Sequence, residues 1–138
     1  MKVLVADKFE TAGVDGLKEI GCAVVLRPDV TAEDLAETIR EVDPKVLVVR
    51  SKKVNAAALA AGPALALVIR AGAGIDTIDV AAASAKGVFV ANCPGKNAIA
   101  VAELTWALIL SCDRRVPDQT ADLRVGKCDS RRLAGGNL

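Results

Sequence analysis

Short apolar runs alternate with helical segments along most of this sequence, and that alternation constrains its fold more than any other feature. Each run is four or five residues long and apolar at every position, as expected of a strand that is buried on both faces. The predicted strands are Val3–Ala6, Ala23–Leu26, Val46–Val49, Leu65–Ile69 and Val88–Ala91. The segments between them predict helices over Thr11–Ile20, from an N-cap at Thr31 to Val42, over Asn55–Ala61 and over Asp79–Lys86.

Strict alternation of strand and helix predicts an α/β fold with a parallel sheet covered on both faces. Five strands in 138 residues predict the flavodoxin-like order 2-1-3-4-5, with a ligand crevice at the carboxyl ends of the strands. We expect residues 1–96 to form this core. Residues 97–138 would add a long apolar helix, a short helix over Asp118–Val125 and a tail to the same domain.

The helix predicted over Asn97–Cys112 is apolar around nearly its whole circumference, so it must be covered on all sides. A single small sheet covers only one side. We therefore expect a homodimer through this helix, with exchange of the helix between protomers across Pro94-Gly95 as one form of it. The apolar residues are Ile99, Val101, Leu104, Trp106, Leu108, Ile109 and Leu110.

Composition argues against several classes of partner. Eighteen basic and 17 acidic residues leave a net charge of +1, and only three aromatic residues are present, so a nucleic-acid partner is not expected. The four cysteines show no CxxC spacing, so neither a metal site nor a redox dithiol is expected. Because no signal peptide or membrane-spanning run is recognisable, we expect a cytoplasmic protein without a membrane partner.

Four segments carry a family resemblance: VLVVRS, VIRAGAGIDTIDVAAASAKGVFVANCPG, NAIAVAELTWALIL and RRVPDQTADLRVGKCD. Through them essentially the whole chain resembles the substrate-binding domain of the D-isomer-specific 2-hydroxyacid dehydrogenases, most closely their D-3-phosphoglycerate dehydrogenase branch. The resemblance implies a flavodoxin-like domain that clamps substrate against a separate NAD-binding domain, whose nucleotide fingerprint begins just after the position where this sequence ends. It also places the family's catalytic histidine, glutamate and an arginine in that other domain.

This sequence contains no histidine. Hydride transfer needs an acid–base group and a bound nicotinamide, so we expect no catalytic residue, no bound cofactor and no dehydrogenase activity in this chain alone. NAD is the cofactor that the resemblance implies for the full-length family. Two alternatives stay open: one half of a two-chain NAD-dependent dehydrogenase completed by a separate nucleotide-binding domain, and a purely oligomerising module.

The resemblance also implies a substrate site. It places Arg50, Ser51, Arg70 and the segment Gly72-Ala73-Gly74 at the cleft, and Asn92 near the cofactor. Glycine permits close approach of the backbone to an anion, and guanidinium pairs with it in a bidentate manner, so weak binding of a small anionic ligand is expected. The alternative for Arg50 and Arg70 is that they are solvated charges at the ends of their strands. Two positions depart from the family pattern: Ala73, where a hydroxyl residue is common, and Cys128, where tryptophan is expected.

Simpler roles compete for some of these residues. Gly72-Ala73-Gly74 is not expected to bind a dinucleotide by itself, because Thr77 stands where a third glycine is needed. We expect Asp76 and Asp79 to be helix caps before any ligand role. Cys93 is expected to fill a loop, and Trp106 to contribute packing.

Overall fold

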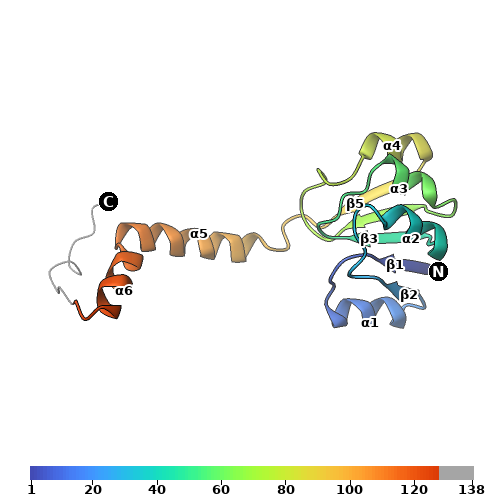
Figure 1. Ribbon diagram of the computed structural model, residues 1–138. Coiled ribbons are helices and arrows are strands. Elements are labelled where there is room, and N and C mark those ends of the chain that lie inside the picture. Colours follow the sequence, from blue (N-terminus) through green and yellow to red (C-terminus); the bar gives the residue numbers. More distant parts are fainter. Residues whose placement is uncertain (128–138) are drawn as a thin grey trace. The chain divides into compact units, whose positions relative to one another are not determined.

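The computed structural model describes residues 1–127, which fall into two compact units (Figure 1). The first unit is Met1–Gly95, and the second begins at Lys96. Residues 128–138, which include Cys128 and the predicted tail, lie outside the described residues.

The first unit is built on a five-stranded parallel sheet. Its order is β2-β1-β3-β4-β5, which confirms both the predicted fold class and the predicted winding. The strands are β1 (Lys2–Val5), β2 (Ala23–Leu26), β3 (Val46–Val49), β4 (Leu67–Arg70) and β5 (Phe89–Asn92). The helices are α1 (Thr11–Glu19), α2 (Leu35–Val42), α3 (Ala56–Ala61) and α4 (Val80–Lys86).

The two faces of the sheet are covered unequally. In Figure 1, α2, α3 and α4 lie on one side of the sheet and α1 on the other. Alternate residues of the central strands point to opposite faces, so Leu4 and Leu47 join the larger core cluster with α2, α3 and α4. Val3 and Val46 join the smaller cluster on the α1 side. Both clusters pack against the central strands and so fix the edge that the carboxyl ends of these strands form.

On the face of the sheet that α1 covers, no helix of the first unit covers the edge strand β5. Leu67 of β4 packs only partly into the smaller cluster, and its register partner on β5 is Phe89. Register partners on neighbouring strands point to the same face, yet Phe89 is 77% exposed. One helix therefore leaves an apolar strip of this unit uncovered.

Element boundaries differ from the predicted ones where local turns intervene. Leu65 is outside β4 because its N–H donates to the Gly62 carbonyl oxygen at 3.1 Å, which holds it in a turn. Thr31 does not cap α2. Its hydroxyl oxygen accepts from the Asp34 N–H at 3.1 Å and so closes an earlier turn, and α2 begins only at Leu35.

The predicted cap at Asp79 is confirmed, and the one at Asp76 is wrong. Oδ1 of Asp79 accepts from the Ala82 N–H at 2.9 Å in the first turn of α4. Asp76 caps no helix within residues 1–127, because a turn from Ile75 to Ile78 and a parallel bridge between Ile78 and Val54 postpone the start of α4.

The second unit contains α5 (Ala98–Asp113) and α6 (Val116–Arg124). None of the residues of α5 is buried, and its seven large apolar side chains are 42–77% exposed. The start of α6 was predicted two residues too late, since Pro117 is accepted in the first turn of a helix, where its missing N–H has no partner to lose. Within residues 1–127 no helix is long and apolar enough to cross a membrane.

Candidate functional site

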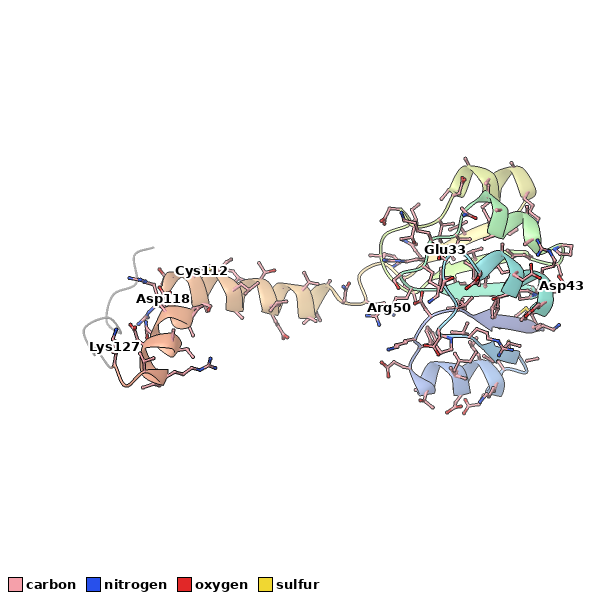
Figure 2. All side chains as sticks on the ribbon, viewed as in Figure 1. Glu33, Asp43, Arg50, Cys112, Asp118 and Lys127 are labelled. Carbon is pink, nitrogen blue, oxygen red and sulfur yellow. The ribbon has the colours of Figure 1, made fainter. Side chains whose placement is uncertain are left out.

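The carboxyl ends of β3 and β4 bring two arginines together. Val49 and Arg70 are register partners, and Arg50 follows Val49 directly, so both arginines lie at the same edge of the sheet. Nε of Arg70 donates to the backbone carbonyl oxygen of Arg50 at 3.0 Å. Figure 2 shows Arg50 at this edge of the first unit.

The glycine segment after β4 makes room for the Arg70 side chain. A Cβ atom added to Gly72 would lie 2.1 Å from Nη1 and 2.6 Å from Cζ of Arg70, so the guanidinium group occupies the space that a larger residue would fill. At Gly74 the same Nη1 would be 3.9 Å away, and Oδ1 of Asp76 only 2.6 Å away. At both positions an added Cβ atom would press on the end of a side chain, which would have to shift.

Residues at the end of β5 donate hydrogen bonds to the segment Gly72-Ala73-Gly74. Nδ2 of Asn92 donates to the Ala73 carbonyl oxygen at 2.7 Å, and the Cys93 N–H donates to the Gly72 carbonyl oxygen at 3.0 Å. The structure thus brings Asn92 onto the predicted substrate loop. Its expected position near a cofactor stays a prediction.

Asp7 is a site residue that the sequence analysis did not identify. Asp7 lies two residues after the end of β1 and is only 8% exposed. Its Oδ2 accepts from the N–H groups of Arg50, Ser51 and Lys52 at 2.8, 2.9 and 3.2 Å. Its Oδ1 accepts from the Ser51 hydroxyl at 3.1 Å and lies 3.6 Å from Nζ of Lys52. One carboxylate therefore organises the whole turn after β3.

Burial and hydrogen bonding act on the pKa of Asp7 in opposite directions. Burial by itself raises the pKa, because it penalises the charged form. The hydrogen bonds from the Arg50, Ser51 and Lys52 N–H groups and from the Ser51 hydroxyl together outweigh it and lower the pKa below its ordinary value of 3.8. Asp7 is therefore an anion at neutral pH.

This arrangement decides which groups can meet a bound anion. Three successive N–H groups would themselves attract an anion, but the Asp7 carboxylate already accepts from all three. The Ser51 hydroxyl is also directed to Asp7. The groups at this edge that suit an incoming carboxylate or phosphate are therefore the guanidinium groups of Arg50 and Arg70.

The glycine segment does not fit a dinucleotide. A phosphate-binding glycine loop leads directly into the N-terminus of a helix, whose N–H groups and dipole meet the phosphates. Here Gly74 is followed by the Ile75–Ile78 turn and the bridge to Val54 instead. Within residues 1–127, no group of three or more histidine, cysteine or acidic residues is placed to hold a metal ion.

A shallow hollow of about 270 Å³ lies between the turns that precede α3 and α4. It is lined by Lys53–Asn55 and Asp76–Asp79, and none of the predicted substrate residues lines it. Two of its polar groups, Oδ1 of Asn55 and Oδ1 of Asp79, already cap the neighbouring helices. The hollow is therefore separate from the arginine pair.

Comparison with known proteins agrees with the fold. Residues 3–125 match the family described as D-isomer specific 2-hydroxyacid dehydrogenase, catalytic domain. The chain belongs to this family. That match confirms the resemblance drawn from the sequence segments.

The relatives show how much of the family proteins this chain corresponds to. It is 40% identical over 139 residues to a D-3-phosphoglycerate dehydrogenase of Methanocaldococcus jannaschii, covering 100% of this chain and 26% of that protein. It is 45% identical over 107 residues to a hydroxypyruvate reductase of Thermotoga maritima, covering 77% and 34%. The chain thus spans about a quarter to a third of the length of these relatives.

A solved structure of the family has a similar fold. The NAD+-bound 3-phosphoglycerate dehydrogenase of Entamoeba histolytica superposes with a TM-score of 0.71 at 34% identity, over 83% of this chain and 39% of that one. The chain is therefore homologous to the substrate-binding domain of 2-hydroxyacid and phosphoglycerate dehydrogenases, and it corresponds to a fragment of those proteins.

Proposed function

We propose that this chain binds a small anionic 2-hydroxy or 2-oxo acid at the carboxyl edge of β3 and β4. The observation that carries the proposal is the placement of Arg70, whose guanidinium group lies over Gly72 and is tied to the Arg50 carbonyl oxygen. Arg50 and Arg70 would pair with the carboxylate or phosphate of the ligand. Ser51 and the Gly72–Gly74 segment would shape the site rather than neutralise charge.

Calorimetric titration with 3-phosphoglycerate tests this site. Arg50→Ala and Arg70→Ala should each weaken binding by about tenfold, since each removes a charge-assisted pair. Arg40→Ala is the matched control, because Arg40 is an exposed arginine paired with Glu37 on α2. Equal binding by the wild type and the Arg50→Ala/Arg70→Ala double variant would refute the proposal.

Hydride transfer, in this proposal, needs a nucleotide-binding domain in addition to residues 1–127. The absence of histidine from the sequence and the unsuitable glycine segment support that view. Residues of this chain would bind and orient the substrate anion, and NAD on the other domain would supply the hydride acceptor.

The two-chain alternative can be tested directly. The chain is mixed with a separately produced nucleotide-binding domain of the Methanocaldococcus relative, and NADH oxidation by 3-phosphohydroxypyruvate is followed at 340 nm. Activity above the sum of the two components would establish assembly in trans. No excess activity would leave this chain as a binding domain only.

A second role is favoured by the exposed surface of α5. We propose that α5 is a self-association surface that forms a homodimer, because its seven large apolar side chains are 42–77% exposed. Light scattering after size exclusion measures the solution mass, and a monomer at micromolar concentration would refute this role.

A further inference from the structure

Asp7 connects three parts of the first unit that are far apart in sequence. It follows β1, and its carboxylate accepts from backbone N–H groups 43 to 45 residues later, at the end of β3. The first residue of that turn contributes the Arg50 carbonyl oxygen, which accepts from Nε of Arg70 at the end of β4. Asp7, the Arg50 peptide and Arg70 thus form a continuous chain of hydrogen bonds.

We infer that Asp7 is a positioning residue for anion binding: by fixing the turn Arg50–Lys52, it holds the carbonyl oxygen that aims the Arg70 guanidinium group over Gly72. This inference rests on the proposed function, because it assigns Asp7 a role in the same anion site. Asp7 does not itself contact the anion, since its own negative charge would repel it.

The burial of the group agrees with a fixed position. The side chain of Asp7 is 12% exposed and that of Lys52 is 15% exposed, so both charges are held where solvent screening is reduced. Lys52 also donates to the Pro28 carbonyl oxygen at 3.1 Å, which ties the turn to the loop after β2. The turn is therefore held from two sides, and Asp7 supplies most of its hydrogen bonds.

A second consequence concerns selectivity. Without the Asp7 carboxylate, three adjacent N–H groups and the Lys52 ammonium group would surround a gap the size of one carboxylate group, which only a small anion such as formate could fill. Asp7 fills that gap from within the chain. An incoming anion is thereby directed to the arginine pair.

The test is removal of the carboxylate and its replacement from solution. In Asp7→Ala, the affinity for 3-phosphoglycerate measured by calorimetry should fall by about tenfold. Addition of about 50 mM formate, a carboxylate small enough to occupy the vacated position, should restore most of it. In the wild type, formate competes for the arginines and should weaken binding, so the opposite sign in the variant identifies the positioning role.

Controls separate this role from general stability. Leu59→Ala removes a buried side chain from the larger core cluster. At a temperature where this variant is folded, it should bind 3-phosphoglycerate like the wild type. Asp7→Asn keeps the size of the side chain and serves if Asp7→Ala does not fold. In it, amide hydrogen exchange of Arg50, Ser51 and Lys52 should become at least tenfold faster.

The outcomes distinguish the two claims. If Asp7→Ala and Asp7→Asn bind as tightly as the wild type while Arg70→Ala binds about tenfold more weakly, the positioning role is refuted and the arginine site stands. If the wild type fails to bind, or binds no better than the Arg50→Ala/Arg70→Ala variant, the proposed function is refuted and the positioning role with it.

Discussion

Nε of Arg70 lies 3.0 Å from the backbone carbonyl oxygen of Arg50 and donates a hydrogen bond to it. The bond links the ends of two neighbouring parallel strands through a side chain rather than through the sheet ladder. It uses the one guanidinium nitrogen that faces back along the side chain and leaves the outer nitrogens for a ligand.

Arg70→Lys tests whether that geometry matters beyond charge. Lysine keeps the positive charge but has no Nε–H, so the tie to Arg50 and the bidentate pairing are both lost. We expect the affinity for 3-phosphoglycerate to fall about tenfold, nearly as far as in Arg70→Ala, with little change in melting temperature. Calorimetry and a thermal melt measure the two quantities, and wild-type affinity in the lysine variant would contradict the geometric account.

Gly72→Ala should disturb the site without unfolding the protein. The added Cβ would lie 2.1 Å from Nη1 of Arg70, and a flexible side chain can move away where backbone cannot. We expect weaker anion binding and a small change in the free energy of unfolding. The measurements are a ligand titration and urea denaturation.

Gly16→Ala is the matched control for that substitution. Gly16 lies inside α1 with nothing within 4 Å of an added Cβ, so alanine there should stabilise the fold by about 0.5–1 kcal/mol and leave binding unchanged. Equal effects of the two substitutions on binding would show that Gly72 has no special role.

A larger loss of stability is expected from Gly62→Ala. Its added Cβ would lie 2.7 Å from Cγ2 of the buried Ile39 and 3.1 Å from Cβ of Leu65, and neither atom can withdraw easily from a packed core. Overpacking of this kind costs about 1–3 kcal/mol, measured as a lower urea midpoint. An unchanged midpoint would mean that the turn before β4 relaxes more than its contacts suggest.

The parts of this fold that were predictable from sequence depend on local patterns. Apolar runs predicted all five strands, and the capping role of Asp79 depends on a residue only three positions away. The role of Asp7 depends on partners 43 to 45 residues away, and no pattern near Asp7 indicates them. Only the pairing of β1 with β3, which follows from the predicted strand order, could have directed attention to it.

The helix starts show a second limit of the sequence. Thr31 and Pro117 are residues typical of helix starts, yet α2 begins four residues after Thr31 and α6 begins one residue before Pro117. Neither helix has a side-chain cap hydrogen bond, and at α2 the turn closed by the Thr31 hydroxyl precedes the helix. Asp76 likewise precedes its helix, because the bridge to Val54 postpones the start of α4.

Acid titration should reveal the contribution of Asp7 to stability. Its pKa is lowered in the folded state, so its stabilising contribution is complete above the ordinary value of 3.8 and is lost as the pH falls through the lowered pKa. Asp7→Asn should therefore be less stable than the wild type by about 2 kcal/mol at pH 6. The difference should narrow below pH 3.8, as followed by urea denaturation at a series of pH values, whereas a difference that grows with acidity would contradict the assignment.

The solitary tryptophan makes the α5 surface directly observable. Trp106 is the one tryptophan of the sequence and is 64% exposed in α5, so its emission should shift to shorter wavelength as the protein concentration rises and a dimer forms. Leu104→Lys places a charge on the same helix and should lower the association constant at least tenfold. Glu103→Gln changes the net charge by the same amount without adding charge to an apolar position, and it should associate like the wild type. Identical concentration dependence in all three proteins would show that α5 does not mediate association, and its apolar side chains would then need a different partner.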